Sequence, residues 1–500
     1  MSSLTEQRIR NPEIRKRVTD AATAAAHIRD GMTVAMSGFT PSGYPKAVPV
    51  ALAKRVRASG EKCRIFLMTG ASVGEEVDTE LTVSGILGKR IPYQTNDHLR
   101  RGINARDVAF LDPHLGEMDG QVRRGFFGSV HVAVVEACTI TEEGHIVPTT
   151  SVGNSPTFLQ VAEKVIVEVN TAQPMQLEGL HDIFCPGDPP NRKPIPLVRP
   201  GERVGEPFMR VDPDKIVAVV MTDQKDAPRG LGEPDEACIA ISRYLVDFLQ
   251  HEVNQGNLPN TLLPLQSGVG EVANSVLKGL VDCSFSELTV YSEVIQDGVL
   301  DLIDAGKISF ASGTALTLSP ARLEHFLSNL DLYTKQVILR PQEITNSGEV
   351  ISRLGCIAMN TAVETDIFGN VNSSHVLGNR LINGIGGSGD FARNGYVSIF
   401  CTPSIKAAGA ISSVVPMVSH VDHTDHDVDI IITEQGLADL RGMAPEQRAV
   451  SIIERCAHPS FRDALKEYWE RSKLGGGHFP VDLETAFSWH VNFKRTKSMK

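Results

Sequence analysis

The residue with the clearest chemical potential is Glu293, which stands in the stretch LTVYSEVIQDG directly after a strongly apolar run. A carboxylate at the end of a buried strand is well placed to act as a nucleophile or general base in an α/β enzyme. The same pattern also fits an ordinary solvated glutamate, because most carboxylates lie at protein surfaces. Position alone therefore marks Glu293 as a candidate and leaves both interpretations open.

A second candidate is Asn346 in EITNSGEVISRLG, which precedes a helical pattern that includes Glu349. The side-chain amide of Asn346 could donate a hydrogen bond to a substrate carbonyl. Asn346 or Ser347 could equally cap the following helix.

The turn Gly268-Val269-Gly270 links an apolar run, 261–265, to a predicted helix, 271–280. Glycines at such a turn allow backbone amides to approach a phosphate, and the helix N-terminus adds free N–H groups and the positive end of its dipole. A tight strand-to-helix turn that binds nothing fits the same residues.

Gly384, Gly386 and Gly389 in NGIGGSGDF match the pattern GxGxxG. The preceding residues are not an apolar strand, and no helix with an acidic residue follows at the expected distance, so a dinucleotide site is disfavoured. A run of glycine amides also suits an oxyanion hole, which stabilises negative charge as it develops. A flexible loop is the alternative.

His420, His423 and His426, together with Asp422 and Asp425, form the stretch SHVDHTDHDVD. The spacing HxxHxxH is neither that of an HExxH helix nor that of a zinc ribbon. The sequence therefore predicts a polar loop between strands and no metal site.

Short apolar runs that alternate with helical patterns would position these residues. Continuous apolar runs of this kind predict buried strands of an α/β protein. The predicted strands are 32–36, 64–68, 131–136, 165–169, 216–220, 262–265, 288–291, 337–339, 397–400 and 429–433.

The chain is expected to form two similar α/β domains. A Pro-rich stretch, 173–234, ends in a linker-like segment, 222–236, after which a helical pattern at 237–252 opens a new part of the chain. Each half also contains an apolar run, a glycine-containing turn and an amphipathic helix, at 36–53 and 265–280. This similarity predicts a duplicated domain, with boundaries 1–230 and 231–500.

Composition excludes several classes of protein. The 500 residues carry a net charge of −11, which disfavours a broad nucleic-acid-binding face. No apolar stretch approaches the length of about 18 residues that spans a bilayer, and the basic start lacks the apolar core of a secretory signal. The eight cysteines form no CxxC pair, which favours a reducing cytoplasm over a disulfide framework.

Several longer stretches together resemble the acetyl-CoA hydrolase/transferase branch of the class I CoA-transferases, over essentially the whole chain. The resemblance looks closest to members that exchange CoA between succinyl-CoA and acetate, and to their propionyl-CoA:succinate relatives. The matching stretches are SGFTPSGYPK (37–46), LMTGAS (67–72), SVGNSPTF (151–158), LPLQSGVG (263–270), YSEVIQDG (291–298), NGIGGSGDFARN (383–394), PMVSHVDH (416–423) and ITEQGLADLRG (432–442).

The resemblance assigns roles to particular residues. It implies that Glu293 is the nucleophile, that Asn346 and Gly387 form the oxyanion hole, and that Glu434 lies beside the substrate carboxylate. Where the family carries a CoA-binding lysine, this chain has Ala407, and the nearest lysine of this chain, Lys406, stands one residue earlier. An active-site arginine of the family corresponds to Lys225 or Arg229. The implied CoA-contacting residues are Gly268, Val269, Gly270, Val363, Asn383, Gly387 and Lys406.

The resemblance also implies the fold and the reaction. It implies two similar open α/β domains of the CoA-transferase type with the active site at their interface, in a cytoplasmic homodimer. The reaction would transfer CoA from an acyl-CoA such as succinyl-CoA to acetate or propionate, by a ping-pong mechanism through a glutamyl-CoA thioester. CoA would be a substrate, with no permanently bound cofactor and no metal.

Rival functions are acetyl-CoA hydrolysis on the same scaffold, a nucleotide-dependent oxidoreductase and a CoA-binding regulator. Thioester loss without added carboxylate, NAD binding, and acyl-CoA binding without turnover would distinguish them.

Overall fold

The computed structural model describes residues 3–228, 230, 232, 234–268 and 270–500, and these form two compact units. Unit 1 consists of Met1–Gly230, Val290–Asp297 and Phe310–Arg353, and unit 2 of Leu231–Thr289, Gly298–Ser309 and Leu354–Lys500. The units therefore interleave along the chain, and the segment that carries Glu293 belongs to unit 1. Two uninterrupted domains, 1–230 and 231–500, stay a prediction.

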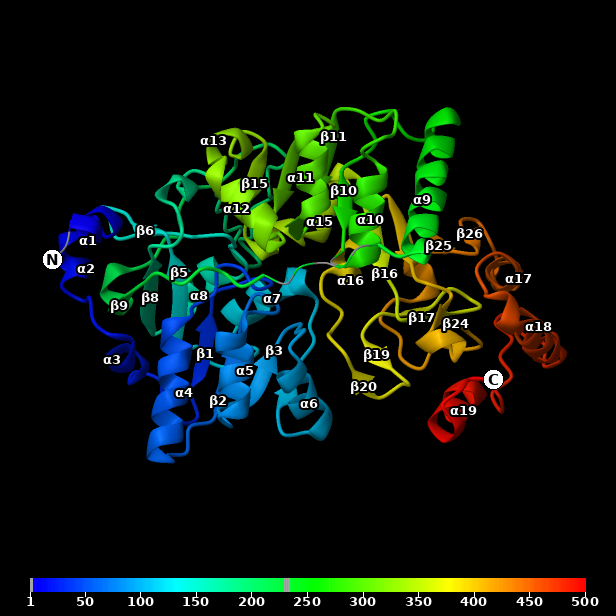
Figure 1. Ribbon diagram of the computed structural model, residues 1–500, viewed down its shortest axis with the longest axis horizontal. Helices are drawn as coiled ribbons and strands as arrows, with labels where there is room; N and C mark the ends of the chain where they lie inside the picture. The colour runs from blue at the N-terminus through cyan, green and yellow to red at the C-terminus, as the bar shows by residue number, and fades with distance from the viewer. Residues whose placement is uncertain (1–2, 229, 231, 233, 269) are drawn as a thin grey trace. The chain divides into compact units, whose positions relative to one another are not determined.

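Unit 1 is built on a seven-stranded sheet of order β4-β3-β2-β1-β5-β8-β9, in which every recorded pairing is parallel (Figure 1). Its strands are β1 (Thr33–Met36), β2 (Ile65–Met68), β3 (Leu87–Ile91), β4 (Ala109–Phe110), β5 (Val132–Ala137), β8 (Lys164–Asn170) and β9 (Ile216–Thr222). Outside that sheet lie the hairpin strands β6 (Thr139–Ile140) and β7 (Ile146–Val147), the parallel pair β12 (Val294–Gln296) and β14 (Ala315–Thr317), and β15 (Val337–Leu339).

Helices cover the unit 1 sheet through apolar faces at helical spacing. In α4 (Ala47–Ser59), Val48, Leu52 and Val56 recur every four residues and pack into one core with Val34 of β1 and Leu67 of β2. The remaining helices of this unit are α1 (Ser3–Arg8), α2 (Pro12–Arg15), α3 (Ala21–Ala25), α5 (Glu75–Val83), α6 (Asp97–Ala105), α7 (Leu115–Arg123), α8 (Ser155–Val161), α12 (Pro320–Ser328), α13 (Leu330–Tyr333) and α14 (Gln342–Thr345).

Unit 2 contains the strand series β10-β16-β21-β25-β26, which is parallel except for the last pair. These strands are β10 (Leu265–Ser267), β16 (Ile357–Thr361), β21 (Val397–Cys401), β25 (Ile430–Thr433) and β26 (Gly436–Asp439). Unit 2 also contains short strands that form separate small sheets: β17 (Glu364–Asp366), β18 (Val371–Asn372), β19 (His375–Val376), β20 (Arg380–Leu381), β22 (Ile405–Lys406), β23 (Ile411–Ser412) and β24 (Val414–Val415).

The helices of unit 2 are α9 (Glu236–Asn254), α10 (Glu271–Gly279), α16 (Ser388–Asn394), α17 (Pro445–Arg455), α18 (Pro459–Leu474) and α19 (Ser488–Thr496). Aromatic residues of the last segments, including Phe461 and Trp469, pack into a core with Phe368 and Phe400. Four elements straddle the division of the chain: β11 (Leu288–Tyr291), α11 (Asp297–Asp304), β13 (Ile308–Gly313) and α15 (Gly348–Leu354). Among the described residues, no helix is long and apolar enough to cross a membrane.

The mixed α/β architecture with parallel sheets is confirmed, and most predicted strands are found. The exception is the strand predicted at 262–265, which begins only at Leu265. Leu262 closes a turn with φ of 51°, where its N–H bonds the carbonyl of Pro259, and Pro264 has no N–H to give to a sheet. The apolar run there reflects burial of Leu262 in a turn rather than a strand.

Candidate active site

Glu293 lies between β11 and β12, at the carboxyl end of a buried strand. Its backbone carbonyl accepts hydrogen bonds from the N–H groups of Thr314 (2.7 Å) and Ala315 (3.2 Å). Gly313 permits this approach, because a Cβ atom there would lie 3.2 Å from the Glu293 carbonyl oxygen and 3.1 Å from Ile295. The backbone of Glu293 is therefore fixed while its side chain is half-buried.

Asn346 directly contacts the carboxylate of Glu293. Its Nδ2 atom donates to Oε1 of Glu293 at 2.6 Å, while its own Oδ1 accepts from the Thr345 hydroxyl at 2.9 Å. Asn346 is buried and forms the C-cap of α14. The structure thus brings together two residues that the sequence placed 53 positions apart.

Helix α14, which precedes Asn346, is tied to strand β11, which precedes Glu293. The hydroxyl of Tyr291 donates to the carbonyl of Ile344 at 2.6 Å, in addition to the hydrogen bond between Asn346 and Glu293. Two independent links restrict the relative movement of the carboxylate and the amide.

Ion pairs of Glu343 further fix the position of α14. The carboxylate of Glu343 accepts from Arg123 at 2.7 Å and 2.8 Å and from Arg192 at 2.6 Å, and Gln342 donates to the Leu115 carbonyl at 3.0 Å. Sequence reasoning missed Glu343 and Arg123. They are 220 residues apart in the chain, and neither stands in a recognisable motif.

Distant loops converge on the segment that follows Glu293. Val152 and Gly153 donate to the carbonyl and hydroxyl of Thr314 at 2.9 Å and 3.0 Å. The hydroxyl of Ser42 donates to the Leu316 carbonyl at 2.5 Å. An apolar cluster surrounds β12 and β14 and contains Phe39, Ala71, Leu115, Val294 and Ala315. The stretches 37–46, 67–72 and 151–158 therefore support the Glu293 segment within unit 1.

The other predicted site residues belong to unit 2, where parallel strands align their carboxyl ends. Gly268 follows β10, Val363 follows β16, Lys406 lies beyond β21 and Glu434 follows β25. Ligands of open α/β sheets bind beyond this edge. Val269 lies outside the described residues, and Gly270, the N-cap of α10, has a φ of 134° that favours glycine.

Lys406 and Val363 are in contact. The ammonium of Lys406 donates to the Val363 carbonyl at 2.7 Å. Burial lowers the pKa of Lys406 to about 8, against the opposing effect of the nearby Glu364 carboxylate. A lysine cation at this edge is suited to an anionic ligand.

Glu434 is held in its ionised form. Burial alone would raise its pKa, but hydrogen bonds from the Ser404 hydroxyl and from the Gln435 amide outweigh burial and keep the pKa below its ordinary value. The Ser404 N–H also donates to this carboxylate at 2.7 Å. The position of Glu434 is therefore fixed from two sides.

Asn383 and Gly387 lie in the glycine loop between β20 and α16. Gly387 is the N-cap of α16, and the Asn383 side chain accepts from the N–H of Gly384 at 2.8 Å. The preceding strand, β20, is short and pairs antiparallel with β19. A dinucleotide fingerprint requires a parallel βαβ unit instead, so the structure supports the sequence-based rejection of that fingerprint.

The histidines of the 420–426 stretch do not converge on one point. His420 pairs with Asp422, His423 is buried against the hydroxyls of Ser373 and Ser388, and His426 is 84% exposed beside Asp425. The predicted polar loop precedes β25, as expected.

The two candidates for the family's active-site arginine differ. Arg229 lies outside the described residues, and Lys225 is exposed. Beside Lys225, the carboxylate of Asp226 is buried and pairs with the ammonium of Lys46 at 2.9 Å. The segment that carries Lys225 and Asp226 is thereby anchored to Lys46 of unit 1.

Comparison with known proteins agrees with these features. Family models match at residues 2–221, the acetyl-CoA hydrolase/transferase N-terminal domain, and at 323–469, the corresponding C-terminal domain. A succinyl-CoA:acetate CoA-transferase of Clostridium kluyveri is 51% identical over 99% of this chain and 93% of its own length. An acetyl-CoA hydrolase of Schizosaccharomyces pombe is 43% identical, over 100% of this chain and 99% of its own.

A propanoyl-CoA:succinate CoA transferase of Escherichia coli is 46% identical, over 96% of this chain and 98% of its own. Among solved structures, RipA from Yersinia pestis has the same fold, with a TM-score of 0.74 at 21% identity over 92% of this chain and 98% of its own. Matches over nearly the full length, in sequence and in fold, establish that this chain belongs to the acetyl-CoA hydrolase/transferase family of enzymes.

Proposed function

We propose that this enzyme transfers coenzyme A from an acyl-CoA to a small carboxylate through a covalent thioester on Glu293. The observation that carries the proposal is the 2.6 Å hydrogen bond from the buried Asn346 amide to the Glu293 carboxylate. It places a neutral donor beside a carboxylate at the end of a buried strand, which is the arrangement that acyl transfer to a carboxylate nucleophile requires.

In the first half-reaction, a carboxylate oxygen of Glu293 attacks the thioester carbonyl and the C–S bond breaks. CoA leaves as a thiolate, and an acyl-glutamyl anhydride remains. The thiolate then attacks the glutamyl carbonyl, which releases the first carboxylate and forms the glutamyl-CoA thioester. A second carboxylate reverses both steps and departs as the new acyl-CoA, so the thioester bond energy is conserved without ATP.

The other assigned residues would supply binding and charge stabilisation. We assign the Gly387 N–H and the Asn346 amide to the oxyanion hole, because each tetrahedral intermediate carries a negative oxygen. Glu434 is assigned to the carboxylate-substrate side, and Gly268, Val269, Gly270, Val363, Asn383 and Lys406 to CoA. No metal or permanently bound cofactor takes part in these steps.

The substrates proposed are succinyl-CoA with acetate or propionate, by analogy with the transferase relatives. The second candidate function is acetyl-CoA hydrolysis, favoured by the hydrolase relatives of similar identity. In that reaction water, rather than a carboxylate, discharges the intermediate. We further propose a cytoplasmic homodimer; the free state of the described cysteines is compatible with a reducing compartment.

The test is to incubate the enzyme with succinyl-CoA without acceptor and to measure the mass of the peptide containing Glu293. A CoA adduct that acetate discharges is expected, and Glu293→Gln should abolish both the adduct and turnover. Glu324→Gln, at an exposed position of α12, is the matched control.

CoA release that needs no carboxylate would instead support the hydrolase. If succinyl-CoA, acetyl-CoA and propionyl-CoA all stay intact, the proposal is wrong.

A further inference from the structure

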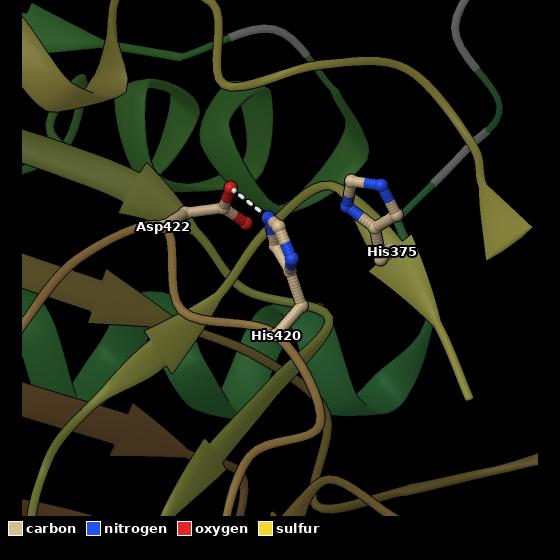
Figure 2. Close-up of side chains that lie close together, drawn as sticks. All are labelled: His375, His420 and Asp422. Carbon is tan, nitrogen blue, oxygen red and sulfur yellow. Dashed lines mark ion pairs between the residues drawn. The ribbon is translucent and has the colours of Figure 1, made fainter. Parts of the chain in front are cut away.

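A cluster of metal-ligating side chains lies in unit 2 and contains none of the residues assigned to the reaction. It consists of His375 from β19 and of His420 and Asp422 from the segment before β25 (Figure 2). One ligand atom from each residue lies within 4.8 Å of the others. The spacing of His420, His423 and His426 gave no sign of this cluster, because the second imidazole comes from 45 residues upstream.

One separation in the cluster already fits a small divalent ion. Nε2 of His420 is 3.2 Å from Oδ1 of Asp422. Two ligands bound to zinc at about 2.0–2.1 Å with tetrahedral angles are about 3.3 Å apart. The histidine–carboxylate pair therefore already has the spacing of two bound ligands.

Neighbouring groups orient the cluster. The N–H groups of Ser373 and Ser374 donate to Oδ2 of Asp422 at 2.6 Å and 2.9 Å. The Ser374 hydroxyl lies 2.8 Å from Nδ1 of His375 and 2.7 Å from Oδ1 of Asp422, so one side chain contacts two of the three ligands. Outer hydrogen bonds of this kind position ligands in metal sites.

Access and donor type identify the class of ion. The Asp422 side chain is 4% exposed and the His420 side chain 39%, so the carboxylate is held in the protein while an imidazole faces solvent. Two imidazoles and one carboxylate suit zinc and similar transition metals, whereas magnesium and calcium prefer oxygen ligands alone.

We propose that His375, His420 and Asp422 form a binding site for one divalent transition-metal ion, with zinc as the type, whose fourth ligand is water. This revises the sequence-based expectation that the chain binds no metal. The ion takes no part in the proposed acyl transfer. It fixes the 420–422 segment, which continues into His423, and Nε2 of His423 lies 3.1 Å from the hydroxyl of Ser388 at the start of α16.

The test is a titration of chelator-treated full-length enzyme with Zn²⁺ by calorimetry and with Co²⁺ by visible absorption. One ion per chain is expected, with a cobalt spectrum that lacks thiolate charge-transfer bands. His375→Ala, His420→Ala and Asp422→Asn should abolish this binding, and Ser374→Ala should weaken it by about 10- to 100-fold. His426→Ala is the matched control, because His426 lies outside the cluster, and should bind as the parent does.

Circular dichroism of each variant, with His375→Gln and His420→Gln as milder changes, separates loss of the site from loss of the fold. Absence of Zn²⁺ and Co²⁺ binding in the parent enzyme overturns the proposal. Binding that survives all of the ligand substitutions, or that shows cobalt–thiolate bands, overturns it equally, because the ion would then be held elsewhere.

Discussion

At the scale of single residues, the proposed chemistry depends on how Glu293, a weak nucleophile, is held. A carboxylate attacks a thioester slowly unless the developing oxyanion is stabilised by fixed donors. Asn346 is a neutral donor, so it can bond the carboxylate of Glu293 in the resting enzyme without protonating it. In the proposed mechanism, the same amide is then available where negative charge appears in the intermediate.

Replacing Asn346 by Ala should lower kcat by about 10²- to 10³-fold, with a much smaller change in KM, since a single oxyanion donor contributes this much. Asn346→Asp should be at least as damaging, because a second carboxylate beside Glu293 raises the pKa of the nucleophile. Steady-state kinetics with succinyl-CoA and acetate provide the measurement. The control is Asn329→Ala, at an exposed position, which should leave kcat unchanged. If kcat of Asn346→Ala equals that of the parent enzyme, Asn346 takes no part in the mechanism.

Lys406 should make acyl-CoA capture sensitive to alkaline pH. Its pKa of about 8 means that the free enzyme loses this cation as the pH rises through 8, and kcat/KM for the anionic acyl-CoA should fall over the same range. Lys406→Arg should move that fall to higher pH, because a guanidinium stays charged. Lys406→Met should raise KM for the acyl-CoA at neutral pH. If the pH profiles of kcat/KM for the parent, Lys406→Arg and Lys406→Met coincide, Lys406 does not bind CoA.

At the scale of elements, the site depends on short segments that would not be stable on their own. Helix α14 has four residues, too few for a stable isolated helix. Its position comes from the Glu343 ion pairs and from the Gln342 and Tyr291 hydrogen bonds. Asn346 is therefore placed by residues other than Glu293 itself.

Glu343→Gln should consequently lower kcat about tenfold or more with little effect on KM, because small displacements of a catalytic group are costly. It leaves the Arg123 guanidinium less well paired, so the free energy of unfolding should fall as well. Glu343→Asp should restore part of kcat. The matched control is Glu349→Gln, whose carboxylate pairs with Arg353 at an exposed position. A loss confined to stability, with kcat intact, would make Glu343 purely structural.

At the scale of the whole molecule, each unit is built around parallel strands and buries polar side chains, which lose their contact with water. His181 is fully buried, and its Nε2 lies 2.8 Å from the Thr149 carbonyl. Burial lowers the pKa of His181 to about 4, against a smaller opposing effect of that hydrogen bond. The folded protein therefore keeps this ring neutral where the unfolded chain takes up a proton.

This difference predicts acid sensitivity with a defined sign. Between about pH 6.5 and pH 4 the unfolded state binds one more proton at this site than the folded state, so stability falls as the pH falls. The contribution is on the order of 3 kcal/mol. Urea midpoints from pH 4.5 to 7.5 should fall less steeply for His181→Gln than for the parent, and parallel curves would contradict the assignment.

Local sequence indicated the longer buried strands, the helices α9 and α10, and the identity of the chemical groups. Apolar runs and their spacing are properties of neighbouring residues, so β5, β8 and β11 could be predicted from the chain alone. The motif around Glu293 and the matching stretches elsewhere also identified the family before any geometry was known. The run at 262–265 failed because burial in a turn and burial in a strand give the same local signal.

Tertiary structure alone decided which of these groups meet. The Glu343–Arg123 pair, the Asp226–Lys46 pair and the approach of His375 to His420 join residues far apart in the sequence. The interleaved units likewise place Glu293 with the N-terminal part of the chain. Such pairings follow from the path of the whole backbone, in which burial and hydrogen bonding are balanced over many elements at once, and no local pattern of residues encodes that balance.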